Sequence, residues 1–224
     1  MADDVRLDIG CGGRGTHWDG FIGVDILPAP PEPEPVTDRP YIQLDFVHDR
    51  LPWEDGTVNE IIALHVVEHL ERQDGRLLIQ RALRLLRPGR RLTVTCPDLR
   101  LLATWYLSGE MGVDGGDRSS PNWRGATCAD RFNWIVHCYG HKWAYDLQSL
   151  TLLAVEAGAF INDIRPVNLT GESAYAGKKN HECGVEIIAR GDEVARSSLS
   201  VSSVELEHRI QIWHGREKRG LKNR

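Results

Sequence analysis

The sequence predicts an α/β protein built around a parallel β-sheet. Short runs rich in β-branched and apolar residues alternate with segments of helical periodicity, a pattern typical of parallel α/β sheets. The first run leads directly into a glycine-rich string, LDIGCGGRG at residues 7–15. The length of 224 residues and the hydrophobic content of 41% suit one core-forming domain, or one domain with an appendage.

Seven strands are expected, because seven short runs of β-forming residues are bounded by turn residues. The first five are residues 5–9, 21–25, 41–46, 60–65 and 91–95. Two late strands follow at residues 160–167 and 185–189.

Two helices and one loop are predicted from local signals. Residues 74–87 carry leucines at helical spacing and lead into Pro88-Gly89, a stop-and-turn signal. A second helix is expected from Asp146, a good N-cap, to Gly158. Residues 27–40 hold six of the eleven prolines, so they are expected to form an extended loop.

The domain is expected to span residues 1–190, with a tail at 191–224. Residues 98–145 form a long mixed segment that carries four of the seven tryptophans. A segment of that length between a strand and a helix is commonly functional, so we expect a substrate-side insertion or lid. Beyond Gly191 the composition turns to serine and charged residues. The segment from His208 to Arg224 contains six basic residues and one acidic residue.

Composition and charge narrow the classes of protein. The net charge of −5 gives no reason to expect a nucleic-acid partner. No run approaches the roughly 18 apolar residues of a membrane span, and the early first strand leaves no room for a signal peptide. The five cysteines are scattered without a CxxC pair, which favours reduced thiols. We therefore expect a cytoplasmic protein, and apolar residues in the tail (Ile210, Ile212, Trp213) leave a homo-oligomer open.

The glycine string is compatible with two cofactors. Gly10, Gly12 and Gly15 satisfy the GxGxxG pattern of nicotinamide-binding domains. That pattern requires a full helix after the glycines and an acid about 20 residues on. Here residues 13–20 leave only eight positions for a helix between the glycines and the next strand. Asp25, the acid that ends that strand, follows Gly10 by only 15 residues. S-adenosylmethionine (SAM) lacks a pyrophosphate but needs a carboxylate for its ribose hydroxyls, so the spacing favours SAM over NAD.

Longer strings carry a resemblance to a known family. LDIGCGG…GFIGVDI, LPWEDGTVNEIIALHVVEHL, LRLLRPGRRLTVTCPDL and GHKWAYD follow one another between residues 5 and 167. In order and spacing they resemble class I SAM-dependent methyltransferases, above all a small bacterial group with a shortened first crossover helix. The resemblance implies a Rossmann-like, seven-stranded mixed sheet with an antiparallel last hairpin. It also implies SAM as cofactor, with S-adenosylhomocysteine as product, across the carboxyl ends of the central strands.

The resemblance assigns the first cofactor residues to the glycine string and the second strand. Gly10 and Gly12 would form the loop under the methionine moiety, with Asp8 beside them. Asp25 would hold the ribose, with Ile26 next to it.

Further cofactor contacts are implied near the third and fourth strands. Asp45 would meet the adenine amine and Phe46 the ring, with Asp49 as an alternative to Asp45. His65 would line the cofactor through its backbone. Cys11 is interpreted as a small loop residue rather than a nucleophile.

Methyl transfer to a hydroxyl requires substrate alignment and a base, because the sulfonium is already activated. The candidates are Asp98, His137, His141 and Tyr145. We favour His141, with His137 one helical turn before it, since histidine titrates in the useful range. Alternatively, His141 and Tyr145 only cap the following helix and pack the lid.

No metal site is predicted. His137, Cys138 and His141 lie close in sequence, but neither a fourth ligand nor a paired spacing accompanies them. Glu68 and His69 are expected to tie their helix to neighbouring loops rather than to act in catalysis.

The sequence therefore predicts O-methylation of a hydroxyl on a saccharide or small polar metabolite. Tryptophans near the expected site suit sugar rings. The alternatives are a catalytically silent SAM-binding partner subunit and, less favoured, an NAD-dependent oxidoreductase.

Overall fold

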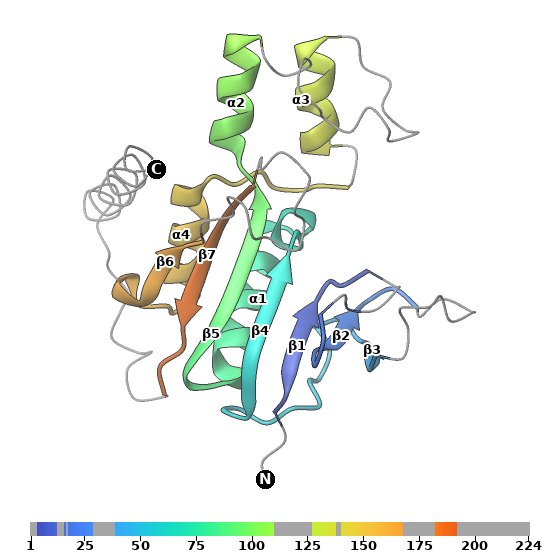
Figure 1. Cartoon of the computed structure of the whole chain (residues 1–224), viewed down its shortest axis with the longest axis vertical. Coiled ribbons are helices and arrows are strands. Elements are labelled where there is room, and N and C mark those ends of the chain that lie inside the picture. Colours follow the sequence, from blue (N-terminus) through green and yellow to red (C-terminus); the bar gives the residue numbers. More distant parts are fainter. Residues whose placement is uncertain are drawn as a thin grey trace.

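The protein was analysed in a computed structural model (Figure 1), which describes residues 4–12, 16, 18–28, 39–109, 127–137, 140–167 and 182–191. Gly15, Trp123, Cys138, the prolines between 29 and 38, and the tail from residue 192 lie outside the described residues. The sequence-based expectations for them stay predictions.

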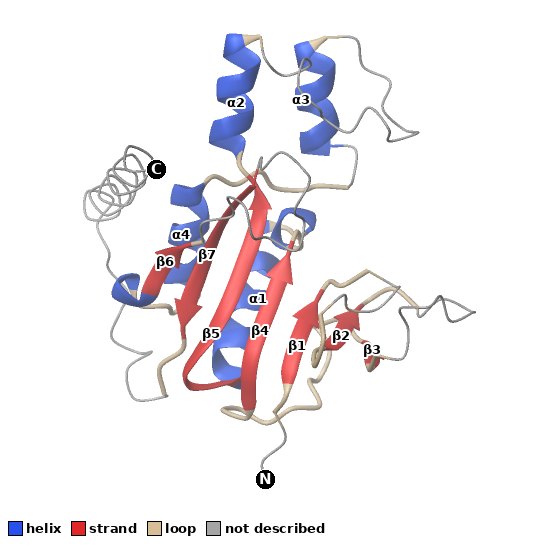
Figure 2. Cartoon of the chain, in the orientation of Figure 1, coloured by secondary structure: helices blue, strands red, loops and turns tan. Residues whose placement is uncertain are grey.

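The core of the fold is a single seven-stranded sheet of order β3-β2-β1-β4-β5-β7-β6 (Figure 2). The strands are β1 (Arg6–Ile9), β2 (Ile22–Asp25), β3 (Tyr41–Gln43), β4 (Val58–Leu64), β5 (Leu86–Pro97), β6 (Ile164–Pro166) and β7 (Glu182–Ile188). The first five are parallel, and β7 runs antiparallel to both β5 and β6. The predicted mixed sheet with an antiparallel last hairpin is confirmed.

The central strands are buried because they pair on both sides. Leu7 of β1 lies between Ile22 of β2 and Ile61 of β4, and both Leu7 and Ile61 have no exposed surface. The strand order reverses between β1 and β4, and ligands of open α/β sheets bind at the carboxyl ends of the strands beside such a switch point. The fold thus places Gly10 and Gly12, which follow β1, at the expected binding edge.

Two helices pack side by side on one face of the sheet, α1 (Arg72–Leu85) and α4 (Leu147–Glu156) (Figure 1). Leu78, Ile79 and Ala82 form the buried stripe of α1 at helical spacing. Full burial of one such leucine or isoleucine stabilises the fold by about 1.5–3 kcal/mol. The predicted N-cap Asp146 begins α4 in a capping box with Ser149.

Two further helices, α2 (Leu99–Ser108) and α3 (Cys128–His137), stand beyond the carboxyl end of β5 (Figure 1). They pack on each other through Leu102 and Ile135, surrounded by aromatic side chains of the segment. Residues 98–145, expected to cover the substrate side, thus contribute helices at the edge where the glycine string lies. None of the helices in the described ranges is long and apolar enough to cross a bilayer.

The helix predicted to reach Arg87 ends at Leu85, and β5 begins at once with Leu86. Leu86 is extended (φ −67°, ψ 137°), and two residues later Pro88 cannot continue a helix. The amide of Gly89 (φ +78°) bonds to the carbonyl of Ala189, so the strand continues through the predicted turn.

Two predicted strands are shorter than expected. The run at 160–167 forms a 3₁₀ turn, η2 (Ile161–Asp163), and then only three strand residues, β6. The run at 41–46 ends at Gln43, because the Asp45 side chain folds the chain into a turn. The expected short first crossover is supported, since residues 10–12, 16 and 18–21 contain no helix.

Candidate functional site

The loop after β1 depends on glycine at two positions. Gly10 (φ +70°) and Gly12 (φ +73°) adopt left-handed conformations that residues with a Cβ rarely take. A Cβ on Gly10 would lie 2.4 Å from Cγ2 of Val66, whereas one on Gly12 would meet nothing within 4 Å. The loop therefore approaches the chain after β4 at Gly10 and faces open space at Gly12.

Asp25, at the end of β2, holds this loop. Its Oδ2 accepts a 2.8 Å hydrogen bond from the amide of Gly12, and its Oδ1 accepts one of 2.9 Å from the amide of Leu27. A carboxylate can accept about four hydrogen bonds, so both oxygens keep capacity for ligand hydroxyls. Beside it, Ile26 and Leu27 are 64% and 50% exposed. An anionic acceptor next to exposed apolar side chains suits a nucleoside.

Asp8 precedes the loop on β1, and Cys11 lies within the loop between Gly10 and Gly12. Asp8 is buried on β1, and the Cys11 sulfur lies 2.8 Å from where a Cβ on Gly23 would stand. Burial raises the pKa of Cys11 to about 12, with the charges of Asp8 and Asp25 adding to the shift. The neutral, space-filling thiol supports the interpretation as a loop residue.

Asp45 and Asp49 belong to one turn after β3. Oδ1 of Asp45 accepts hydrogen bonds from the amides of Val47 and His48, and Oδ2 lies 3.0 Å from Nδ1 of His48. Asp49 accepts from the amide of Asp45 at 2.9 Å. Phe46 is only 4% exposed, so its ring packs in the core and an adenine contact would fall to its backbone.

His65 follows β4 with a left-handed backbone (φ 56°), and its ring is held between two carboxylates. Nδ1 lies 3.0 Å from Oε1 of Glu68, and Nε2 lies 2.8 Å from Oε1 of Glu182. Burial opposes protonation of His65, but these two hydrogen bonds outweigh it and raise the pKa to about 9. The ring is therefore a charged bridge within the protein, and the cofactor contact expected of His65 falls to its backbone.

Glu68 lies in the 3₁₀ turn η1 (Val67–His69) and is 1% exposed. Its carbonyl accepts hydrogen bonds from the amides of Lys142 at 2.7 Å and Trp143 at 3.2 Å. The predicted tie between this turn and a neighbouring loop is thus present. Its side-chain Oε2 is buried and has no hydrogen-bond partner.

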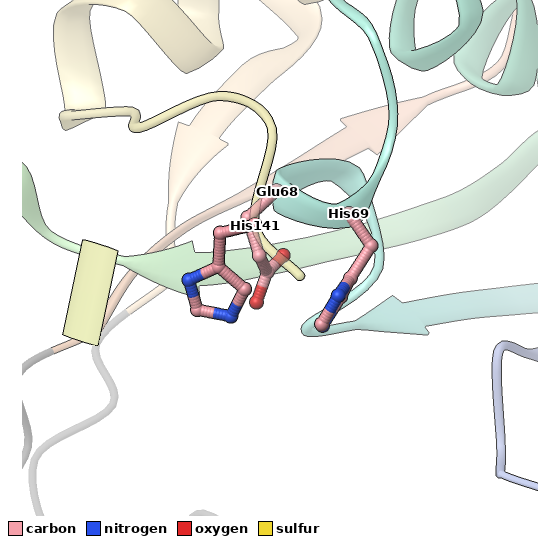
Figure 3. A group of neighbouring side chains, drawn as sticks. All are labelled: Glu68, His69 and His141. Atoms are coloured by element: carbon pink, nitrogen blue, oxygen red, sulfur yellow. The ribbon is translucent and has the colours of Figure 1, made fainter. Parts of the chain in front are cut away.

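These hydrogen bonds to the Glu68 carbonyl place His141 next to His69 (Figure 3). The ring centroids are 4.7 Å apart and the planes meet at 83°. One ligand atom from each of Glu68, His69 and His141 lies within 4.8 Å of the other two. Burial lowers the pKa of His141, so its ring is neutral at pH 7. Sequence reasoning missed this cluster, because His69 and His141 are 72 positions apart.

The other base candidates differ in access. Asp98 is the N-cap of α2, where it accepts from the amides of Arg100 and Leu101. Tyr145 is 1% exposed, and its hydroxyl lies 3.3 Å from where a Cβ on Gly75 of α1 would stand. Capping and packing thus engage these two side chains, and their role as bases stays a prediction. His137 is exposed in the last turn of α3.

A small, mainly apolar pocket lies between η1, the end of β5, α2 and α3. Glu68 and His141 provide the charged or titratable groups in its wall. The other lining residues are Pro97, Leu99, Leu102, Ile135, Val136, Trp143 and Ala144. The His141 cluster therefore borders the segment expected to receive the substrate.

Comparisons with known proteins show the fold. No protein-family model and no curated protein matches the chain. A SAM-dependent methyltransferase from Methanosarcina mazei superposes with a TM-score of 0.51 and 15% identity, over 86% of this chain and 95% of that one. A SAM-dependent methyltransferase from Archaeoglobus fulgidus superposes with a TM-score of 0.51 and 13% identity, over 83% of this chain and 86% of that one. A chain from a Haloferax volcanii complex that contains the Trm112 methyltransferase activator superposes with a TM-score of 0.50 and 12% identity. The match covers 85% of this chain and 84% of that one. The fold is that of SAM-dependent methyltransferases, as the sequence predicts.

Proposed function

We propose that the protein is a SAM-dependent methyltransferase. The observation that carries the proposal is the contact between the Gly12 amide and the Asp25 carboxylate, at the carboxyl ends of β1 and β2 and beside the switch point of the sheet. It combines a glycine loop open to a ligand with a carboxylate that retains acceptor capacity.

The residues at this edge fit SAM. The loop at Gly10 and Gly12 would take the methionine moiety, and Asp25 the two ribose hydroxyls. Exposed Ile26 would cover an adenine face, next to the turn that holds Asp45. When bound, SAM supplies an activated sulfonium methyl group. The absence of a helix among the described residues between β1 and β2 argues against a dinucleotide, whose pyrophosphate needs such a helix.

On the acceptor side, His141 is the residue we expect to activate a hydroxyl. Its neutral ring borders the pocket, and it is held close to the proposed cofactor edge through the tie to Glu68. Alignment of the hydroxyl with the methyl group would supply most of the remaining rate enhancement. His137 remains a second candidate, at the exposed end of α3.

A saccharide or small polar metabolite is the proposed acceptor. Trp143 lines the pocket and is 42% exposed, so it offers a flat apolar surface at the site, of the kind on which sugar rings stack. The alternative, a silent SAM-binding partner subunit, has the same cofactor edge and differs only in turnover.

Calorimetric titration with SAM, S-adenosylhomocysteine and NADH tests the proposal. We expect micromolar binding of the first two ligands and none of NADH. Binding of NADH alone would make the protein an oxidoreductase. SAM binding without methylation in a screen of hydroxyl acceptors, with activity restored by a second chain, would establish the partner role.

A further inference from the structure

We propose that Glu68, His69 and His141 form a binding site for a divalent transition-metal ion such as Zn²⁺ or Co²⁺. Two imidazoles and one carboxylate are a donor set that such ions take in proteins, with further positions left for water or substrate. The three residues come from η1 and from the loop before α4 (Figure 3).

The Glu68 carboxylate is the first reason. Its Oε2 is buried without a hydrogen-bond partner, although an unsatisfied buried polar group costs about 1–3 kcal/mol and more when charged. Its Oε1 is held by Nδ1 of His65 at 3.0 Å, and His65 is held in turn by Glu182. A metal-binding carboxylate is commonly oriented in this way by a hydrogen bond to its other oxygen. A cation at Oε2 would satisfy the remaining atom.

The two imidazoles are the second reason. His141 lies on the loop whose next two residues, Lys142 and Trp143, donate hydrogen bonds to the Glu68 carbonyl. Edge-to-face contact with the His69 ring sets the two side chains beside each other.

The geometry is close to that of a bound ion. The three ligand atoms lie within 4.8 Å of one another, and bonds of about 2.0–2.2 Å would bring them to roughly 3–3.5 Å. The hydrogen bonds from Lys142 and Trp143 to the Glu68 carbonyl already join the two backbone segments, so the approach required of the ligand atoms falls to the side chains.

The position of the site indicates its use. Glu68 and His141 line the small pocket, and Val66, two residues before Glu68, contacts the position of Gly10. An ion here would hold the acceptor hydroxyl in an open coordination position and lower its pKa. His141 would then serve as a ligand in place of the base role, and the hydroxyl proton would pass to water. This role rests on the methyltransferase function proposed above, whereas ion binding itself does not.

Cobalt titration of the full, untagged chain after treatment with a chelator tests the site in the absence of SAM. We expect one Co²⁺ per chain, with visible absorption bands of nitrogen- and oxygen-ligated cobalt, and displacement by Zn²⁺. Glu68→Gln, His69→Ala and His141→Ala should each weaken binding at least about 100-fold, beyond the roughly 10–100-fold typical of residues that only orient ligands. His137→Ala is the matched control and should bind as the parent does.

Several outcomes would overturn the site. No stoichiometric uptake of Co²⁺ or Zn²⁺ by the parent chain would do so, as would uptake unchanged in Glu68→Gln and His141→Ala. Circular dichroism melting of each variant, with His141→Gln as a milder substitution, separates lost ligands from lost fold. SAM binding without metal uptake would overturn this site alone, and metal uptake without SAM binding would overturn the methyltransferase function alone.

Discussion

The amide of Gly12 donates a 2.8 Å hydrogen bond to Oδ2 of Asp25, and this contact joins the loop after β1 to the end of β2. The two residues are 13 positions apart, and parallel pairing of β1 with β2 brings them together. The same carboxylate is thus both the support of the glycine loop and the proposed ribose acceptor.

Asp25→Ala should lower SAM affinity by about 100-fold or more, because hydrogen bonds to a charged acceptor contribute about 1.5–3 kcal/mol each. Calorimetry measures the affinity, and circular dichroism checks that the fold is kept. Asp19→Ala is the control, since that side chain is 96% exposed and pairs with Arg39 in a surface salt bridge. Equal affinities for the Asp25 variant and the parent would remove Asp25 from the cofactor site.

Gly10→Ala should destabilise the protein more than Gly12→Ala. Both variants strain a left-handed backbone at about 1–3 kcal/mol, but only a Cβ at Gly10 meets Val66. Such overpacking adds about 1–3 kcal/mol to the loss in free energy of unfolding, measured by urea denaturation. Val66→Ala in the Gly10→Ala background should recover part of the loss. Equal destabilisation by the two glycine variants would contradict the close approach.

His141→Ala should reduce turnover by about 100-fold or more once an acceptor is known, because it removes the group that activates the hydroxyl. The comparison variant is His137→Ala, whose exposed side chain lies at the end of α3. Rates would be measured at saturating SAM, so that cofactor affinity does not contribute. If His137→Ala lost the activity and His141→Ala kept it, the roles of the two histidines would be exchanged.

His48 should titrate with a pKa above the ordinary value of a histidine. Its hydrogen bond to Asp45 raises the pKa against slight desolvation, and the charges of Asp45 and Asp74 act in the same direction. Because the folded pKa exceeds the unfolded value of about 6.5, its stabilising contribution is complete below that pH. The contribution is lost as the pH rises through the folded pKa. Titration of the imidazole by NMR measures the shift, which Asp45→Asn should reduce; titration of His48 at or below 6.5 in the parent would contradict the ion pair.

The contact between the glycine loop and Asp25 follows from residues that are close in sequence. Gly10, Gly12 and Asp25 lie within one β-loop-β unit, so strand pairing alone determines their relation. The length of that loop was enough to exclude a full crossover helix. Whether Tyr145 packs or acts as a base was left open by the sequence, and the N-cap position of Asp98 was not predicted, because burial and capping depend on where α1 and α2 pack.

The sequence by itself determined the order of the strands along the chain, the position of the glycine string and the carboxylate at the end of β2, since each depends on local periodicity and short spacing. Only the tertiary structure decided which histidines meet. Glu68 and His69 follow β4, whereas His141 precedes α4, and hydrogen bonds from Lys142 and Trp143 to the Glu68 carbonyl join the two segments. Backbone contacts between segments distant in sequence carry no residue pattern of their own, so this cluster becomes visible only once the chain is folded.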